Sequence, residues 1–310
     1  MPLLKKDQAL DIKEGFVVPA NWKSPFFLGA GEEPDRAGLL LLGVPMEYTV
    51  SFRPGTRFGP EAVRAVSESL EEYSLYQDAD LREMNFADLG DLVLPPGNVN
   101  RGLELAKTAA AGIFKDGKVP LFLGGEHLLS YATVQAAVEF FPDLVVLHMD
   151  AHTDLRSEYM GEQLSHASTC RLIAGCLREK RLYQFGIRSG PREDFLYARR
   201  HTNLFTEKVL EPLRKVLPEL KGKPVYCSLD IDLLDPAFAP GTGTPEPGGC
   251  SFQEVLSAVL LLSELHVVGM DLVEVAPEYD PSGITSLAAA KLVREAIIAV
   301  MKGKGAPEQA

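Results

Sequence analysis

Six short apolar runs, rich in valine, leucine and phenylalanine, constrain the fold of this 310-residue chain more than any other feature. Such runs are typical of strands buried on both faces of a parallel sheet, and most are separated by stretches long enough for a helix. The alternation indicates an α/β fold, and we expect one three-layer α/β/α domain over residues 1–310 with a mainly parallel central sheet. The predicted strands are 38–44, 120–124, 144–149, 182–187, 224–229 and 266–275.

Three of the intervening stretches carry helix signals. Pro60 fits the first turn of a helix over 60–76, and Gly117 ends a second helix over 104–118. Ser251 is a suitable N-cap for a third helix over 252–265, and Glu254 would complete a capping box. In an α/β sheet, ligands bind beyond the carboxyl ends of the strands. Polar residues that directly follow the apolar runs are therefore candidates for a functional site.

The charge balance excludes several classes of partner. The chain has 43 acidic and 31 basic residues, a formal net charge of −12, and a field of that sign repels polyanions. We therefore expect no nucleic-acid or membrane partner. The first residues lack the apolar core of a signal peptide, and no apolar run could span a bilayer, so a cytoplasmic protein is expected. The four cysteines form no CxxC pair and are expected to be buried, reduced thiols.

Three polar clusters follow predicted strands. In "HMDAHTDLR" every second residue from His148 to Asp154 is a histidine or an aspartate. A fully extended strand would separate Asp150 from Asp154 by roughly 13 Å, at about 3.3 Å per residue, so the chain must curl after Asp150 if both serve one small centre. A second cluster, Asp230 and Asp232, ends the run "VYCSLDID", and His127 follows a third run and a glycine pair.

The chemistry of these clusters favours a metal site. Carboxylates left close together raise one another's pKa, and divalent cations remove that conflict. Many oxygens with only two imidazoles favour manganese over zinc, and six ligands suit two ions rather than one. We therefore predict two Mn²⁺ per subunit. The predicted ligands are His127, Asp150, His152, Asp154, Asp230 and Asp232.

Each of these clusters, taken alone, also has a simpler interpretation. A single Asp-x-Asp pair is more often a solvated turn or a helix cap, and such a pair also opens the nucleophile loop of some phosphatases. A phosphatase, however, gives no reason for His127 or His152. Three clusters at three predicted strand ends favour the metal site. His148 lies one alternation deeper in its strand, so we expect it to support the site or the core rather than to bind metal.

Taken together, the three motifs resemble those of the ureohydrolase family of arginases, agmatinases and related amidinohydrolases. They are "GGEHLLS" (124–130), "DAHTDLR" (150–156) and "SLDIDLLDPAFAPGTGTPEPGG" (228–249). The segments 43–64 and 271–295 extend the resemblance over nearly the whole chain, and bacterial agmatinases are the most similar members. Many members have Asp where this chain has Glu126. The first 35 or so residues would form an extension that packs on the domain or on a neighbouring subunit.

The resemblance implies roles for individual residues. Glu274 would pair with the substrate guanidinium, and His166 would protonate the departing amine. Asp150 and Asp230 would bridge two ions that activate water for attack on the guanidinium carbon, with Asp154 also part of the catalytic centre. The products would be urea and a primary amine. One ion would be held by His127, Asp150, Asp154 and Asp230, and the other by His152, Asp150, Asp230 and Asp232.

The loop after the second motif bears on which guanidino compound is the substrate. Arg156 stands near the position where arginases are implied to read the α-amino and α-carboxylate groups of arginine, and Tyr159 lies in the same loop. Agmatine, which lacks that carboxylate, is the leading substrate and would yield putrescine for polyamine synthesis. Arginine, guanidinobutyrate and aminopropyl-agmatine remain alternatives. A different class, a non-catalytic metal-binding regulatory protein, also remains open. The resemblance further implies a homo-oligomer, a trimer or a hexamer.

Overall fold

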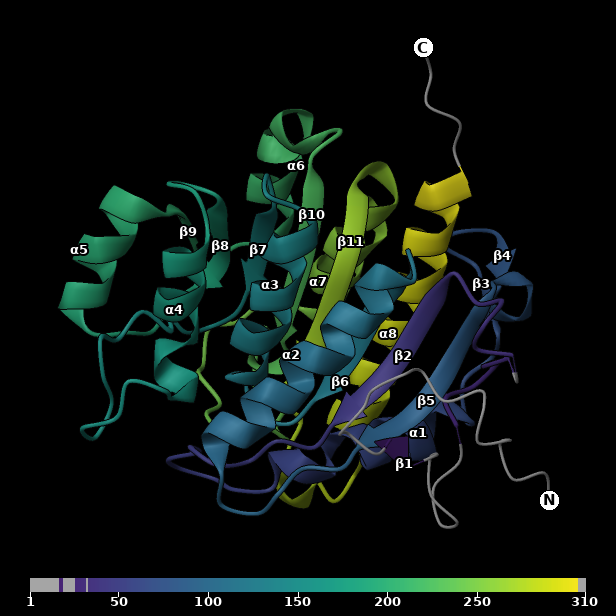
Figure 1. The fold of residues 1–310 in the computed structure, drawn as a ribbon, viewed down its shortest axis with the longest axis horizontal. Coiled ribbons are helices and arrows are strands. Elements are labelled where there is room, and N and C mark those ends of the chain that lie inside the picture. Colours follow the sequence, from purple (N-terminus) through teal and green to yellow (C-terminus); the bar gives the residue numbers. More distant parts are fainter. Residues whose placement is uncertain (1–16, 19–25, 32, 306–310) are drawn as a thin grey trace.

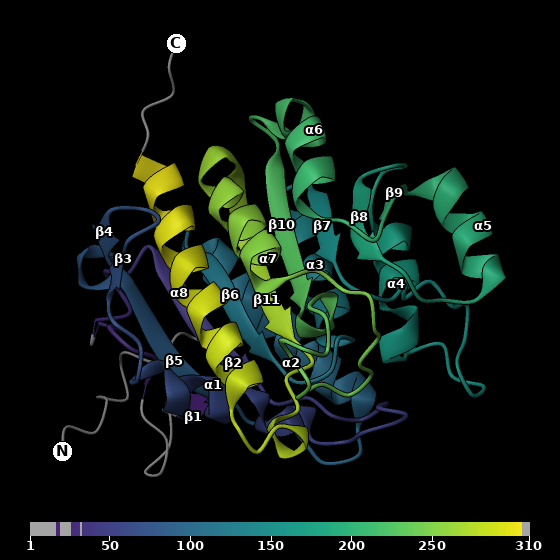
Figure 2. The same ribbon diagram turned by 180° about the vertical axis from the view of Figure 1, so that it is seen from behind.

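The protein contains a central nine-stranded sheet between two layers of helices, as a computed structural model shows (Figures 1 and 2). The structure describes residues 17–18, 26–31 and 33–305. Most of the predicted N-terminal extension lies outside these residues. Eight strands run parallel, and β1 pairs antiparallel with β5 at one edge. The predicted three-layer fold class is confirmed.

The strands in their order across the sheet are β1 (Val17–Val18), β5 (Phe86–Leu92), β2 (Leu39–Val44), β6 (Val119–Gly124), β11 (His266–Val273), β10 (Pro224–Asp230), β7 (Val145–Met149), β8 (Leu182–Ile187) and β9 (Asn203–Thr206). A separate hairpin consists of β3 (Tyr73–Ser74) and β4 (Ala79–Asp80). The six strands expected from the apolar runs are all present, with ends within two residues of the prediction.

Each face of the sheet is covered by its own helices. The near face in Figure 1 carries α2 (Val99–Lys115), α3 (Leu129–Phe140) and α4 (Thr169–Cys176), with α5 (Arg192–His201) at the side. The opposite face, nearer in Figure 2, carries α6 (Leu210–Leu220), α7 (Phe252–Leu260) and α8 (Ile284–Gly305), with α1 (Gly59–Ser67) beside α8. Two separate apolar cores result, one on each face. No described helix is both long and apolar enough to cross a membrane.

All three predicted helices differ in extent from the observed elements. The helix expected over 60–76 ends at Ser67, whose hydroxyl donates to Arg64 O and accepts the N–H of Leu28, while Tyr73–Ser74 forms β3. The local bond to Arg64 O and the tertiary contact with Leu28 together override the helical pattern of the sequence. Ser251 caps α7 as predicted by accepting the N–H of Glu254.

The capping box at α7 is only half formed. The Glu254 carboxylate accepts the N–H of Val209 instead of reaching back to its own cap residue. The helix predicted over 252–265 also ends earlier, because residues 261–264 form a 3-10 turn.

The helix predicted over 104–118 begins at Val99, where Asn98 caps it by accepting the N–H of Arg101, and ends at Lys115. Three cysteines are buried thiols as expected, whereas Cys176 is half-buried.

A buried ion pair between Arg64 and Asp88 connects α1 to β5. Arg64 is 1% exposed, and its Nε and second guanidinium nitrogen lie 2.7 and 2.9 Å from the two carboxylate oxygens of Asp88. The guanidinium also donates to Gly90 O at 2.9 Å and contacts Asp91, while Asp88 accepts the N–H of Phe27. A bidentate pair of this kind fixes both the distance and the orientation of its two elements.

Replacing Arg64 by methionine should lower the free energy of unfolding by about 3–5 kcal/mol, because Asp88 would stay buried without its counterion. Chemical denaturation followed by circular dichroism measures the change. Arg36→Met is the matched control, since Arg36 pairs with Glu33 on the exposed surface and should matter little. Equal midpoints for the two variants would contradict the assigned role of Arg64.

Candidate metal centre and active site

The polar clusters meet at the carboxyl ends of four adjacent central strands. His127 follows β6, Glu274 follows β11, Asp230 ends β10, and Asp150 follows β7. Because these strands are neighbours and run in the same direction, their ends share one edge of the sheet. Residues far apart in the sequence are thereby placed within a few ångströms of one another.

A close backbone approach positions His127. A Cβ on Gly125 would lie 1.9 Å from Met46 O, so only glycine allows the loop after β6 to pass this close to the loop after β2. The N–H of Glu126 donates to Met46 O at 2.7 Å. The next N–H, that of His127, donates to Glu274 Oε1, also at 2.7 Å. The glycine of the first motif therefore holds His127 against Glu274.

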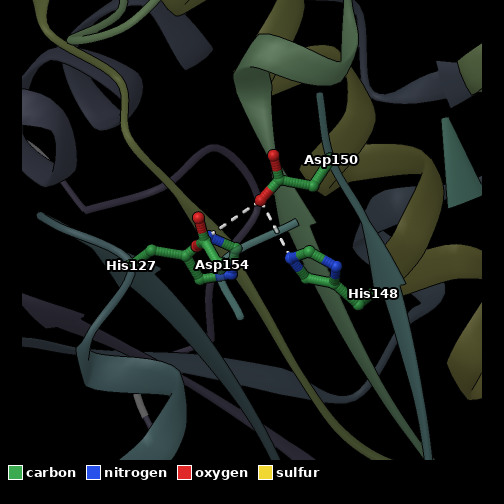
Figure 3. A group of neighbouring side chains, drawn as sticks. All are labelled: His127, His148, Asp150 and Asp154. Carbon is green, nitrogen blue, oxygen red and sulfur yellow. Dashed lines mark hydrogen bonds and ion pairs between the residues drawn. The ribbon is translucent and has the colours of Figure 1, made fainter. Parts of the chain in front are cut away.

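The second motif curls as the sequence requires. The strand ends at Met149, the N–H of His152 turns back to Asp150 Oδ1, and Asp154 takes a left-handed backbone conformation with φ of 51°. Asp150 Oδ2 and Asp154 Oδ2 consequently lie 3.1 and 3.2 Å from His127 Nδ1 (Figure 3). The expected convergence of Asp150 and Asp154 on one centre is observed.

The third motif completes the cluster. Asp230 caps a 3-10 turn by accepting the N–H of Asp232 at 2.9 Å, and its other oxygen lies 3.1 Å from His127 Nδ1. Asp232 Oδ2 lies 2.8 Å from His152 Nδ1. Asp150 faces both imidazoles, because its second oxygen lies 3.6 Å from His152 Nδ1. The structure thus brings all six predicted ligands together in two groups that share Asp150.

The hydrogen bonds of His127 leave one ring nitrogen free to bind a cation. Its Nε2 lies 2.9 Å from Ser228 Oγ, which donates to Asp271 Oδ1 at 2.7 Å. The serine oxygen then accepts a hydrogen bond from an Nε2–H. In the neutral ring, the other nitrogen, Nδ1, therefore carries the lone pair. That buried Nδ1 has no hydrogen-bond partner among the described residues, although three carboxylate oxygens surround it.

The spacing and the charges of the cluster both fit divalent ions. Donor atoms bound at about 2.1 Å in cis positions on one ion stand roughly 3 Å apart, as the atoms around His127 Nδ1 do. Burial, together with the neighbouring carboxylates, raises the pKa of Asp230 well above its usual range. Burial and Asp150 likewise raise the pKa of Asp232. Cations at the centre would remove this conflict between buried like charges.

A cavity of about 430 Å³ opens over the cluster, a size suited to a small-molecule ligand. Glu274 is buried in its wall with a left-handed backbone φ of 66°. Burial raises the pKa of Glu274 to about 8, although the N–H of His127 acts in the opposite direction. A cationic ligand in contact with this carboxylate would favour its charged form.

His166 lines the same cavity and is held by the loop after β2. Its N–H donates to Thr49 Oγ1 at 2.9 Å, and its ring nitrogens lie 3.3 Å from the hydroxyls of Thr49 and Ser51. Thr49 is in turn fixed by Glu126, whose carboxylate accepts the N–H groups of Tyr48 and Thr49, both at 2.7 Å. Glu126, noted in the sequence only as a departure from Asp, therefore supports the surroundings of His166.

The predicted substrate loop also reaches the cavity. Arg156 and Tyr159 both line it, with the guanidinium carbon 5.3 Å from the Tyr159 ring centre. The Tyr159 ring meets the His166 ring edge to face at 5.6 Å. Asp194, which sequence reasoning missed, is a further lining residue and accepts from Thr153 Oγ1 at 2.7 Å. It belongs to α5 and follows no strand-end motif, so no local signal marked it.

Comparisons with known proteins agree with this geometry. The model of the Arginase family matches residues 37–299. The chain belongs to the arginase family. It is 48% identical to the agmatinase of Bacillus anthracis, over 86% of this chain and 93% of the relative, and 47% identical to that of Bacillus subtilis, over 89% and 96%. The crystal structure of agmatine ureohydrolase of Thermoplasma volcanium superposes with a TM-score of 0.81 at 32% identity, covering 90% of this chain and 95% of that one.

Saturating Mn²⁺ should raise the unfolding temperature of this family member, because ions that bind only the folded state stabilise it. The gain is about 2.7 kcal/mol at a concentration 100 times the dissociation constant. Scanning calorimetry of chelator-treated protein with and without Mn²⁺ measures the shift. Asp230→Ala should abolish it, whereas Asp143→Ala, which removes an exposed carboxylate, should retain it. A full shift in Asp230→Ala would exclude Asp230 from the metal site.

Proposed function

We propose that this protein is an agmatinase, a hydrolase that converts agmatine and water into putrescine and urea. The observation that carries the proposal is the convergence of six metal-ligand candidates, five of them buried and His152 half-buried, next to the cavity that Glu274 lines. The identity of 47–48% with bacterial agmatinases, over nearly nine tenths of the chain, supports the same assignment. In cells the reaction would supply putrescine for polyamine synthesis.

Two divalent ions, which we propose are Mn²⁺, would occupy the two groups of the cluster. Bound there, they supply the Lewis acidity that makes water a nucleophile near neutral pH. Asp150 is suited to contact both ions, because one of its oxygens lies near His127 and the other lies near His152. One ion would be held by His127, Asp150, Asp154 and Asp230, and the other by His152, Asp150, Asp230 and Asp232.

Glu274 would orient the guanidinium. Its Oε1 is engaged by the N–H of His127, and its carboxylate borders the cavity beside the cluster. A planar set of N–H donors meeting a carboxylate makes strong, directional hydrogen bonds. The substrate cation would favour the ionised carboxylate and so offset the pKa increase caused by burial. Binding would therefore place the guanidinium carbon beside the cluster in one orientation.

His166 would deliver a proton to the departing amine. The ring reaches the cavity, and Thr49 and Ser51 hold its two nitrogens. Burial lowers the pKa of His166, while the charge of Asp154 acts in the opposite direction. An imidazole can take up and release a proton within one catalytic cycle, as this role requires. Protonation of the amine nitrogen would allow the C–N bond to break with the bonding pair going to that nitrogen, so that this end of putrescine leaves as a neutral amine.

The charges on the cavity wall are compatible with the aminobutyl tail of agmatine. Arg156, the candidate reader of a substrate carboxylate, stacks on Tyr159. Burial raises the pKa of Asp194, while the hydrogen bond from Thr153 and the charge of Arg156 lower it. Since the Arg156 charge is partly balanced by Asp194, the wall presents both signs rather than a bare cation. A guanidino acid such as arginine or guanidinobutyrate remains the second candidate, because Arg156 does line the cavity.

Three wider features belong to the same proposal. We place the protein in the cytoplasm, where free thiols such as its four cysteines persist. We propose that the whole chain forms a single ureohydrolase domain, which the match over residues 37–299 supports. By family resemblance we also propose a homo-oligomer, a trimer or a hexamer.

Urea release by Mn²⁺-loaded protein should be fastest with agmatine when four substrates are compared at equal concentration. The panel consists of agmatine, arginine, guanidinobutyrate and aminopropyl-agmatine, and kcat/KM is the quantity to measure. If another compound of the panel had a higher kcat/KM, that compound would be assigned as the substrate in place of agmatine. If none of the four compounds released urea, the proposed enzymatic activity would be wrong, and a non-catalytic metal-binding protein would be favoured.

Glu274→Gln is the informative variant in the same assay. It should keep its metal but lose about 100-fold or more in kcat/KM for agmatine, because hydrogen bonds to a charged group contribute about 1.5–3 kcal/mol each. Metal analysis of the purified variant is the control. Unchanged kcat/KM would remove Glu274 from the mechanism.

Removing the Thr49 hydroxyl should lower kcat about 3- to 10-fold with little change in KM, because His166 loses the partner that orients it. Thr49→Val removes the hydroxyl and Thr49→Ser retains it, so the two variants form a matched pair. Steady-state kinetics with agmatine measure the effect. Serine and valine variants with the same kcat would show that the hydroxyl does not position His166.

A further inference from the structure

The role of His148 depends on which of its ring nitrogens carries the proton. His148 lies on β7, fully buried, with Nε2 2.9 Å from Asp150 Oδ2. Its ring centre is 5.1 Å from that of His127, and Figure 3 shows the Asp150 carboxylate between the two imidazoles. A bare Nε2 would be a metal ligand, whereas an Nε2–H would be a hydrogen-bond donor to Asp150.

A neighbouring amide decides between these states. Gln184 lies on β8 directly opposite His148 in the strand pairing, and its side chain is fully buried. Its Nε2 lies 2.8 Å from the backbone oxygen of Thr153 and 3.3 Å from His148 Nδ1. A backbone carbonyl can only accept, so the amide nitrogen must face Thr153. The reversed amide would place two acceptors opposite each other.

The orientation of the amide fixes the tautomer of the imidazole. One N–H of Gln184 serves Thr153 O, and the other points at His148 Nδ1, which must accept it with a lone pair. The neutral ring then carries its proton on Nε2 and donates to Asp150 Oδ2. The amide oxygen of Gln184 is engaged on its far side by the Thr202 hydroxyl at 3.1 Å.

We propose that Gln184 is a positioning residue of the metal centre, which makes His148 a hydrogen-bond donor to Asp150 instead of a ligand. The same amide holds the carbonyl of Thr153, one residue before the left-handed Asp154. Gln184, which lies outside the motif, thus contacts the chain both before Asp150, at His148, and after His152, at Thr153. The inference rests on the proposed metal centre but not on the identity of the substrate.

The tautomer can be observed directly in the metal-loaded protein. The chain has six histidines, so protein labelled with ¹⁵N only in histidine and loaded with ¹¹³Cd²⁺ gives a simple magic-angle-spinning spectrum. The signals lost in His148→Phe identify its ring. We expect a protonated Nε2, an unprotonated Nδ1 and no coupling to cadmium. An unprotonated Nε2, coupled to cadmium or not, would overturn the inference, and this result needs no Gln184 variant to fold.

Metal affinity tests the positioning role. Gln184→Leu and Gln184→Glu should each weaken Mn²⁺ binding about 10- to 100-fold in competition with a chelator, as is typical when a group that orients a ligand is lost. Thr202→Val is the matched control, since it removes the contact on the far side of the amide and a hydrogen bond to Ala198 O, and it should change affinity less than about 3-fold.

The outcomes separate this inference from the proposed function. Wild-type protein that binds no Mn²⁺ would defeat the metal centre itself. Wild-type protein that binds Mn²⁺ and releases urea, with Gln184→Leu binding Mn²⁺ equally well, would defeat only the role given to Gln184. Weaker binding in both Gln184 variants and not in Thr202→Val supports it.

Discussion

Repulsion among buried carboxylates is the constraint on which the rest of this structure depends. Asp150, Asp154, Asp230 and Asp232 lie at the carboxyl ends of two adjacent strands, and all are buried or nearly so. Bringing four such groups together from water is unfavourable unless cations share their charge. The two strands, the turns that follow them and the glycine contact that positions His127 can therefore be understood as a scaffold for cation binding.

The orientation of each imidazole at the centre is set by groups that belong to none of the ligand positions. Ser228, bonded to Asp271, leaves Nδ1 of His127 free for a cation. Gln184 has the opposite effect on His148. It donates a hydrogen bond to Nδ1, so Nε2 carries the proton and donates to Asp150. Two buried histidines only 5.1 Å apart thus differ in chemistry because their partners differ. Fixing these protons in advance spares the centre a rearrangement when the cations bind.

The sequence was sufficient where local pattern determines structure. Continuous apolar runs predicted the central strands, and the spacing of the second motif predicted that the chain must curl before Asp154. It failed at β5, whose Asp88 and Asp91 break the apolar pattern and are tolerated only because Arg64 on α1 neutralises them. It also extended α1 too far, since Ser67 at the end of that helix accepts the N–H of the distant Leu28, a contact that no local pattern shows. Both errors come from partners that are remote in sequence.

The same limit applies within the site. The metal-ligand candidates could be found because each lies at a predicted strand end. His166 could be singled out only by resemblance, because its partners Thr49 and Ser51 are more than 100 residues away. Gln184 lies inside an ordinary apolar strand and carries no motif. Residues that orient other residues depend on geometry across the fold, and a local pattern does not record them.

The position of Glu274 links the metal cluster to the charge of the substrate. Its carboxylate accepts a hydrogen bond from the backbone N–H of His127, so the proposed guanidinium-binding group and a proposed metal ligand are directly connected. Burial disfavours the charged carboxylate when the cavity holds no cation, and a guanidinium would reverse that preference. A neutral amide would gain no such stabilisation. Under the proposed function, selectivity for guanidino compounds would follow from Glu274, whereas the choice among them would depend on the loop that carries Arg156 and Tyr159.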